Sequence, residues 1–191
     1  ITGAATNPEL TKPGWNTTYR VIANDNALGA ALADYVAKVA KLKTVAVVDD
    51  RTAYGQGLAS VFKKEAEKQG VKVVASEFTN DKATDFMAIL TSIKAKKPDA
   101  IFYGGMDAQA GPMVRQMKQL GITAKFLTGD GGCSPEMIKL AGDGMSSSAY
   151  CSMPGLPLEK MPCGADFRER YKKRFNADVQ VYSPYAYDAA M

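Results

Sequence analysis

Thr44-Val45-Ala46-Val47-Val48 is an uninterrupted run of β-branched and small apolar residues. Such a run, followed at once by polar residues, is typical of a strand that is buried on both faces of a sheet. Strand starts recur about every 25 to 30 residues along the chain, a spacing that leaves room for one helix in each interval, as a parallel crossover requires. The other runs are Val71 to Phe78, Ala100 to Tyr103 and Lys125 to Leu127.

The intervals between the strands carry the period of amphipathic helices. Apolar side chains recur every three or four positions in residues 26–42, 86–93 and 110–120. Gly70 and Gly121 stand where two of the helices should end, because glycine readily takes the left-handed backbone that closes a helix. Strands that alternate with helices predict an α/β fold whose mainly parallel sheet is covered on both faces.

Two segments fall outside this alternation and predict a second lobe. Residues 1–24 hold a proline-containing loop and an extended stretch at 18–22, and the residues after Met153 form another proline-spaced loop before a helix at 164–175. We therefore expect residues 1–24 to be a portion of lobe 1, residues 25–152 to form lobe 2, and residues 153–191 to return to lobe 1. The chain opens without Met and stops inside an apparent helix start, so we expect an interior fragment of a longer protein.

Composition excludes several classes of protein. The 191 residues are 46% hydrophobic and 23% charged, with a net charge of +4, which is globular rather than disordered. No apolar run approaches the roughly 20 residues that span a bilayer. Because the chain holds no histidine, Ser-His and Cys-His triads and imidazole acid–base chemistry are excluded. The basic residues are dispersed, so we do not expect nucleic-acid binding.

The residues that directly follow the strands predict a binding edge. In an open parallel sheet, ligands bind at the carboxyl ends of the strands. Carboxylates, glycines and an aromatic ring should gather there, and a carboxylate held among backbone donors, covered by the ring of Tyr54, would suit an ammonium group. The residues concerned are Asp49, Asp50 and Tyr54-Gly55, then Gly104-Gly105-Met106-Asp107, then Thr128-Gly129-Asp130-Gly131-Gly132.

Simpler interpretations of these residues stay open. Asp107 is expected to cap a helix, and Asp130 with its glycines would equally suit an ordinary loop. A phosphate loop is not favoured, because the Gly-Lys-Ser/Thr ending is absent. Asp49 and Asp50 point to opposite faces of their strand, so they are poorly placed to share one substrate or metal ion.

Several short motifs occur in an order and at spacings that resemble one family over essentially all 191 residues. The chain is similar to the periplasmic leucine/isoleucine/valine-binding proteins that serve ABC importers. This resemblance implies a type I periplasmic-binding-protein fold with two Rossmann-like lobes that close on a free amino acid. The motifs are Ala4-Ala5-Thr6-Asn7-Pro8-Glu9-Leu10-Thr11, Tyr54-Gly55-Gln56-Gly57, Tyr103-Gly104-Gly105 and Ala141-Gly142-Asp143.

The resemblance also implies which residues meet the ligand. The loop Ala4-Ala5-Thr6 would contact the ligand carboxylate and amino group through backbone groups and a hydroxyl. Asp130 stands where the family places an acidic residue, usually a longer Glu, on the ligand ammonium, and Tyr54 matches the aromatic residue that faces the amino group.

Three further positions come from the same resemblance. Asp25 matches the acidic residue at the first hinge crossing, and Tyr182 lies near a pocket aromatic on the return segment. Met106 stands where some relatives carry Tyr, which alters the side-chain half of the pocket and leaves the identity of the amino acid open. The family's serine and aromatic residue from the first lobe would lie upstream of Ile1.

The three cysteines are Cys133, Cys151 and Cys163, and none belongs to a Cys-x-x-Cys pair, so no metal site is expected. If the protein is exported, as the resemblance implies, two of them are candidates for a disulfide. Cys133 follows the fourth strand and Cys151 ends the next, so this pair is favoured over Cys133 with Cys163. Three reduced thiols are the alternative.

The sequence thus predicts a non-enzymatic, cofactor-free component of an ABC importer, located in the periplasm or otherwise outside the cytoplasm. It would bind a branched-chain or related aliphatic amino acid in the interlobe cleft by hinge closure, with a membrane permease and an ATPase as partners. The alternative is a regulatory receptor of the same fold that senses an amide or aromatic acid. An enzyme that uses the Asp49/Asp50 or Asp107/Asp130 carboxylates ranks third.

Overall fold

The computed structural model describes residues 1–145 and 148–191, and the chain divides into two compact units. One unit combines Ile1–Asn24 with Met153–Met191, and the other is Asp25–Ser152. The boundaries lie where the alternation of strands and helices starts and stops in the sequence. Each unit is described by itself below.

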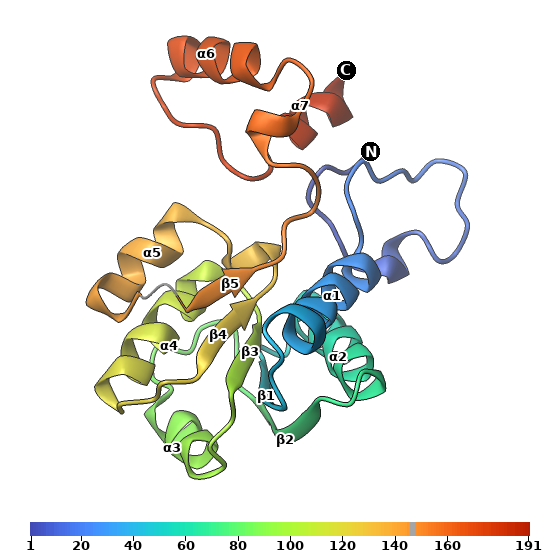
Figure 1. Cartoon of the computed structure of the whole chain (residues 1–191). Helices are drawn as coiled ribbons and strands as arrows, with labels where there is room; N and C mark the ends of the chain where they lie inside the picture. The colour runs from blue at the N-terminus through green and yellow to red at the C-terminus, as the bar shows by residue number, and fades with distance from the viewer. Residues whose placement is uncertain (146–147) are drawn as a thin grey trace. The chain divides into compact units, whose positions relative to one another are not determined.

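The Asp25–Ser152 unit is built on a five-stranded, wholly parallel sheet with the order β2-β1-β3-β4-β5 (Figure 1). The central strands are the most apolar, and all five residues of β3 are buried. This agrees with the prediction of a parallel sheet from uninterrupted apolar runs. The strands are β1 Thr44–Asp49, β2 Lys72–Phe78, β3 Ala100–Gly104, β4 Lys125–Thr128 and β5 Ala149–Cys151.

Helices cover both faces of the sheet, with α1 and α2 on one side and α3, α4 and α5 on the other (Figure 1). Two of the helix ends were predicted from glycine, and Gly70 and Gly121 indeed have positive φ angles of 81° and 64°. The helices are α1 Asp25–Asp34, α2 Ala53–Lys68, α3 Met87–Ala95, α4 Asp107–Gln119 and α5 Pro135–Ala141, with the short turns η2 Tyr35–Val39, η3 Asp130–Gly132 and η4 Gly142–Gly144.

The hydrophobic core lies on both faces of β1 and β3. On one face the fully buried rings of Phe62 and Phe102 stack with their centroids 4.2 Å apart. On the other, Val48, Ile101 and residues of α3 and α4 form a continuous buried cluster. Each such buried side chain contributes about 1.5–3 kcal/mol. This core holds the carboxyl ends of the strands in fixed positions.

Three local predictions were wrong. Residues 26–42 do not form one α-helix, because α1 ends at Asp34 and the chain continues as a π-helical turn, η2. Helix α5 was missed, although Ser134 before Pro135 is a helix-start signal. The stretch 18–22 forms no strand and makes only an isolated bridge between Thr2 and Arg20.

The other unit contains η1 Pro8–Leu10, η5 Leu158–Lys160, α6 Gly164–Phe175 and α7 Ser183–Ala190. Its two chain segments are joined by a hydrogen bond from the Ala23 amide to the Pro154 carbonyl, at 2.9 Å. Gly3 packs so closely on α7 that a Cβ there would lie 2.7 Å from the Tyr185 carbonyl. The N-terminal loop and α7 therefore form one compact body.

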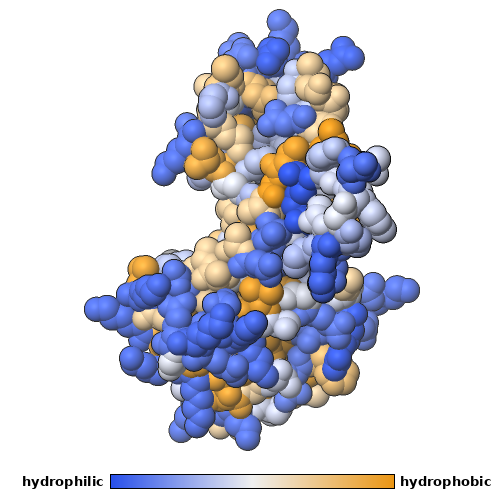
Figure 2. Space-filling view, turned by 90° about the vertical axis from the view of Figure 1, so that its right-hand side faces the viewer, coloured by the Kyte–Doolittle hydropathy of each residue, from blue (hydrophilic) through white to orange (hydrophobic). Residues whose placement is uncertain are grey.

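The surface carries dispersed apolar residues. Figure 2 shows orange apolar residues scattered among blue hydrophilic ones on the face that it presents. Trp15 and Phe175 are both exposed by 62% of their surface. Among the described residues, no helix combines the length and the apolar character needed to cross a membrane.

Candidate functional site

The ends of β1, β3 and β4 lie side by side and define the edge of the sheet at which the candidate site forms. Asp49 at the end of β1 pairs with Gly104 at the end of β3, and Tyr103 pairs with Thr128 at the end of β4. Because these strands are parallel, the loops that follow them emerge together. They supply Tyr54, Met106 and Asp130, so the structure brings together three of the residues predicted for the site.

Tyr54 and Asp130 are joined directly. The Tyr54 hydroxyl donates to Oδ1 of Asp130 at 2.8 Å and accepts the Gly131 amide at 2.9 Å. Asp130 is the first residue of η3 and only 3% exposed. A single phenol thus bonds both the carboxylate and the backbone of the same loop, which fixes how the carboxylate is presented. The sequence placed both residues at this edge but gave no sign of the bond between them.

The glycines of the loop admit the neighbouring side chains. A Cβ on Gly131 would lie 2.8 Å from Sδ of Met106 and 2.9 Å from Cε1 of Tyr54. A Cβ on Gly129 would lie 2.7 Å from the Tyr54 hydroxyl oxygen. Met106, which is 45% exposed, therefore packs on the same loop as Tyr54. Without glycine at these positions, the three side chains could not approach so closely.

A capping arrangement at the start of α2 positions Tyr54. The Thr52 side chain accepts the Gly55 amide at 2.9 Å, and Oδ1 of Asp50 accepts both the amide and the hydroxyl of Thr52, at 2.9 and 2.6 Å. Asp50 is 1% exposed, so its carboxylate serves the loop from the inside. Asp49 is partly exposed and accepts the Arg51 amide, which agrees with the expectation that the two carboxylates face opposite ways.

Burial at this edge also affects Tyr103. Desolvation, and then the nearby charge of Asp50, raise the pKa of the Tyr103 phenol well above its ordinary value. This side chain is fully buried in the cluster beneath the edge and therefore remains a neutral part of the core.

The prediction that Asp107 caps a helix was wrong. The N-cap of α4 is Met106, and Asp107 is the first helical residue. Its Oδ2 accepts the Ser134 hydroxyl at 2.6 Å, while the Ser134 oxygen caps α5 by accepting the Met137 amide. Asp107 thus holds the far end of the loop that carries Asp130. Ser134 was not singled out from the sequence, although a Ser-Pro pair before a helix would have been the signal.

Cys133 and Cys151 form a disulfide with their Cα atoms 5.7 Å apart, and Cys163 is an exposed free thiol. Among the described residues, no group of three or more Cys, Asp or Glu side chains is arranged to hold a metal ion.

The other unit carries the predicted loop Ala4-Ala5-Thr6. The amides of Ala4 and Ala5 donate to the Thr2 hydroxyl oxygen, at 3.3 and 3.0 Å, and the Ala5 carbonyl accepts Nε of Arg20 at 2.8 Å. Thr6 is 2% exposed, and its hydroxyl has no hydrogen-bond partner among the residues that the structure describes. This hydroxyl is the polar group of the loop with the most unused bonding capacity.

The structure places the two remaining predicted residues at helix starts. Tyr182 is the N-cap residue of α7, the helix whose Tyr185 backbone packs on Gly3. It therefore belongs to the same compact body as the Ala4–Thr6 loop. Asp25 is the first residue of α1 in the other unit, and its side chain is fully buried.

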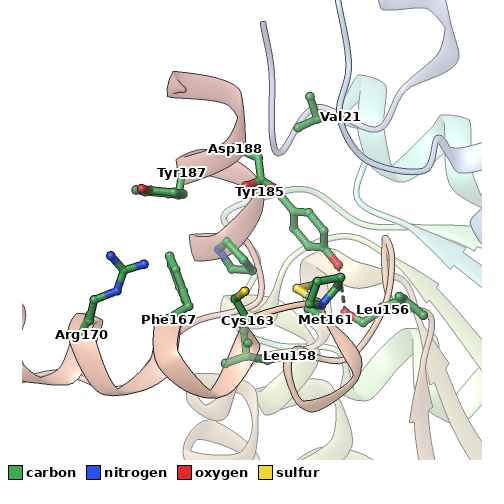
Figure 3. A pocket seen from close by; sticks show the side chains of 13 residues that line it. Val21, Leu156, Leu158, Met161, Cys163, Phe167, Arg170, Tyr185, Tyr187 and Asp188 are labelled. Atoms are coloured by element: carbon green, nitrogen blue, oxygen red, sulfur yellow. Dashed lines mark hydrogen bonds between the residues drawn. The ribbon is translucent and has the colours of Figure 1, made fainter.

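A separate hollow of about 470 Å³ lies between α6, α7 and the loop that precedes them (Figure 3). Phe167 and Tyr187 line it from the two helices, and the Tyr185 hydroxyl donates to the Leu156 carbonyl at 3.1 Å on its wall. Among the described residues that line it, none is a predicted ligand-binding residue. Its apolar lining therefore marks packing of the two helices rather than the candidate site.

A parallel α/β sheet with a buried carboxylate and glycine loops at its carboxyl edge is typical of proteins that bind small polar molecules. The chain belongs to the periplasmic binding protein family, whose model matches residues 1–191.

Two relatives match nearly the whole chain. An amino acid binding protein of Pseudomonas aeruginosa is 33% identical over 187 residues, which are 98% of this chain and 50% of the relative. The Leu/Ile/Val-binding protein homolog 1 of Brucella abortus is 36% identical over 189 residues, 99% of this chain and 50% of the relative. The chain spans about half the length of the curated relatives it matches.

Solved structures agree with the family. The leucine binding protein LivK of Thermotoga maritima matches with a TM-score of 0.91 and 30% identity over 100% of this chain and 54% of that one. The substrate-binding protein LivJ of Streptococcus pneumoniae, from a branched-chain amino acid transporter and in complex with isoleucine, matches with a TM-score of 0.86 and 27% identity over 98% of this chain and 53% of that one. The predicted family and fold are confirmed.

Proposed function

We propose that this chain is part of the substrate-binding component of an ABC importer and that it binds a branched-chain or related aliphatic amino acid. Its family and the names of its relatives support this proposal, as does the similarity to a LivJ structure that holds isoleucine. The geometry of the candidate site supports it independently.

The observation that carries the proposal is the fixed carboxylate of Asp130. It is almost fully buried, held by the Tyr54 hydroxyl, and located where parallel sheets present ligands. A carboxylate in such a place suits a ligand ammonium group, and a charge-assisted hydrogen bond between them contributes about 1.5–3 kcal/mol. The aromatic face of Tyr54 adds a favourable surface for the same cation.

The Ala4–Thr6 loop is the proposed partner of the ligand's carboxylate end. The buried Thr6 hydroxyl would donate to the ligand. The Ala4 and Ala5 amides already donate to Thr2, so a ligand carboxylate would share or replace those two bonds. The 3.3 Å bond from Ala4 is the longer of the two and is the one expected to yield first.

The remaining predicted residues receive supporting roles. Met106 is partly exposed beside Gly131 and would contact the aliphatic side chain of the ligand, because an unbranched thioether adapts to several shapes. Tyr182 would contribute to the pocket from the start of α7, and Asp25 would act at the first crossing between the lobes.

The proposed mechanism is closure without catalysis. Ligand contacts that form only when the lobes close would stabilise the closed state, which a membrane permease and its ATPase would recognise. The periplasm is the proposed location, and the disulfide between Cys133 and Cys151 fits that oxidising compartment.

The decisive experiment is calorimetry on the complete protein with leucine, isoleucine, valine and small amides. We expect micromolar or tighter binding of at least one aliphatic amino acid, no detectable binding by Asp130→Ala, and near-normal binding by Asp49→Asn, a matched carboxylate change at the same edge. Low-micromolar leucine binding by a folded Asp130→Ala protein would overturn the assignment of Asp130. Preference for an amide would favour a sensory receptor instead.

A further inference from the structure

We propose that the Cys133–Cys151 disulfide is a positioning device for Asp130, so that its loss weakens amino-acid binding beyond any effect on the fold. This inference rests on the proposed function. It concerns residues that contact no ligand themselves and act by fixing the loop that carries the acidic group.

The first argument is how near the disulfide is to Asp130. The Cys133 amide donates to the Asp130 carbonyl at 3.0 Å, closing the short turn η3. Cys133 is therefore part of the same turn as the carboxylate, and any movement of its backbone is passed to Asp130 through this bond.

The second argument is where the disulfide leads. Cys151 ends β5 and pairs with Thr128, the last residue of β4, and the next amide, that of Ser152, donates to the Thr128 carbonyl at 3.1 Å. The chain leaves the sheet at Thr128, forms the Asp130 turn, and is returned by the disulfide to the residue beside Thr128. The loop is thus closed into a small ring anchored on the sheet.

The third argument is that the loop needs such a closure. Three of the four residues between Thr128 and Cys133 are glycines, namely Gly129, Gly131 and Gly132. Glycine loses the most conformational freedom when it is ordered, so this loop is costly to hold in one shape. A cross-link removes part of that freedom before the ligand arrives, which is how preorganisation raises affinity.

The loop has one further tie beyond the turn, the 2.6 Å bond from Ser134 to Asp107. Together with Tyr54, these contacts hold the loop from three directions, and only the disulfide is covalent. A purely structural explanation is also available, since both cysteines line an apolar hollow of about 320 Å³ beside α5. The experiment therefore has to separate local positioning from general stability.

The test compares Cys133→Ser/Cys151→Ser with wild type and with Cys163→Ser, which removes only the exposed free thiol. Leucine affinity is measured by calorimetry on the complete oxidised protein, well below each melting temperature. Hydrogen exchange is measured for residues 129–133 and, as an internal reference, for β1. A stability effect alone would not raise exchange in the loop while leaving β1 protected.

We expect the double variant to bind leucine about tenfold more weakly, the value for losing part of one charge-assisted hydrogen bond. Loop exchange should rise while β1 and the Cys163→Ser protein stay as in wild type. Unchanged leucine affinity in the folded double variant would overturn the inference.

If the double variant does not fold, wild type treated with a phosphine reductant replaces it. Cys151 is exposed, so the bond is open to attack, and the phosphine is oxidised as the disulfide becomes two thiols. Unfolding of the reduced protein as well would show a structural staple and overturn the positioning role. Failure of oxidised wild type to bind any amino acid would instead contradict the proposed function, a result distinct from all of these.

Discussion

The phenol of Tyr54 and the carboxylate of Asp130 lie 76 residues apart in the sequence and are joined by a 2.8 Å hydrogen bond. The same hydroxyl oxygen accepts the Gly131 amide, so the helix after β1 is bonded to the loop after β4 through a single atom. The site is therefore preorganised by one contact between the first and fourth strand ends, and changes at that contact should affect binding more than stability.

Removal of this hydroxyl is the first prediction. Tyr54→Phe keeps the ring but loses both bonds, so Asp130 is less firmly held and leucine should bind about tenfold more weakly, corresponding to roughly 1.4 kcal/mol. Calorimetry measures the change. Tyr35→Phe is the matched control in the same unit, because the Tyr35 ring packs on Tyr150, away from Asp130. Equal affinities of Tyr54→Phe and wild type would show that the hydroxyl does not position Asp130.

The parts of this site that the sequence could predict follow from topology. Buried strands were recognisable as apolar runs, and residues after parallel strands meet at one edge, so Tyr54, Met106 and Asp130 could be placed together. The bond between Tyr54 and Asp130 could not be predicted, because it depends on the depth of α2 over the sheet. Asp107 was assigned to its own helix because local capping is common, whereas its partner proved to be Ser134, 27 residues further on.

The fold shows the same limit. Residues 26–42 keep an apolar face throughout, and this pattern does not separate an α-helical turn from a π-helical one. The change at Tyr35 comes with tertiary contacts, including the ring contact between Tyr35 and Tyr150 at 5.0 Å. Periodicity located the element correctly but could not reveal how its last turn is wound.

Crowding at Gly131 gives the second prediction. Gly131→Ala places a methyl group 2.8 Å from the Met106 sulfur and 2.9 Å from the Tyr54 ring. The exposed end of Met106 can move away, but the Tyr54 ring is held by Asp130, so we expect a loss of about 1–3 kcal/mol in stability together with weaker leucine binding. Denaturant unfolding and calorimetry on the same samples measure both.

A second substitution tests the cause. Met106→Ala removes one of the two crowded neighbours, so in that background Gly131→Ala should cost less than it does alone. Met106→Ala by itself serves as the control. Additive effects of the two changes would contradict the packing of Met106 on Gly131.

The third prediction concerns Asp99, whose carboxylate holds the amino end of β1. Its Oδ2 accepts the Lys43 amide, the Thr44 amide and the Thr44 hydroxyl, each at 2.9 Å. Burial by itself would raise the pKa of Asp99, but the hydrogen bonds from Lys43 and Thr44 outweigh it and leave the pKa below its ordinary value. The charged form is therefore bound more tightly in the folded protein than in the unfolded one.

The sign of the pH dependence follows from that lowered pKa. Above the ordinary aspartate pKa of about 3.9, the stabilisation by Asp99 is fully present, and it is lost as the pH falls through the lower pKa of the folded state. Asp99→Asn should destabilise the protein by about 1 kcal/mol at pH 7, since the group is exposed and its bonds compete with water. The difference between wild type and variant should shrink steadily below pH 4. Urea unfolding at pH 7, 4 and 3 measures it, with Asp143→Asn as an exposed control. A difference that stays constant down to pH 3 would contradict the role of the charged carboxylate at the start of β1.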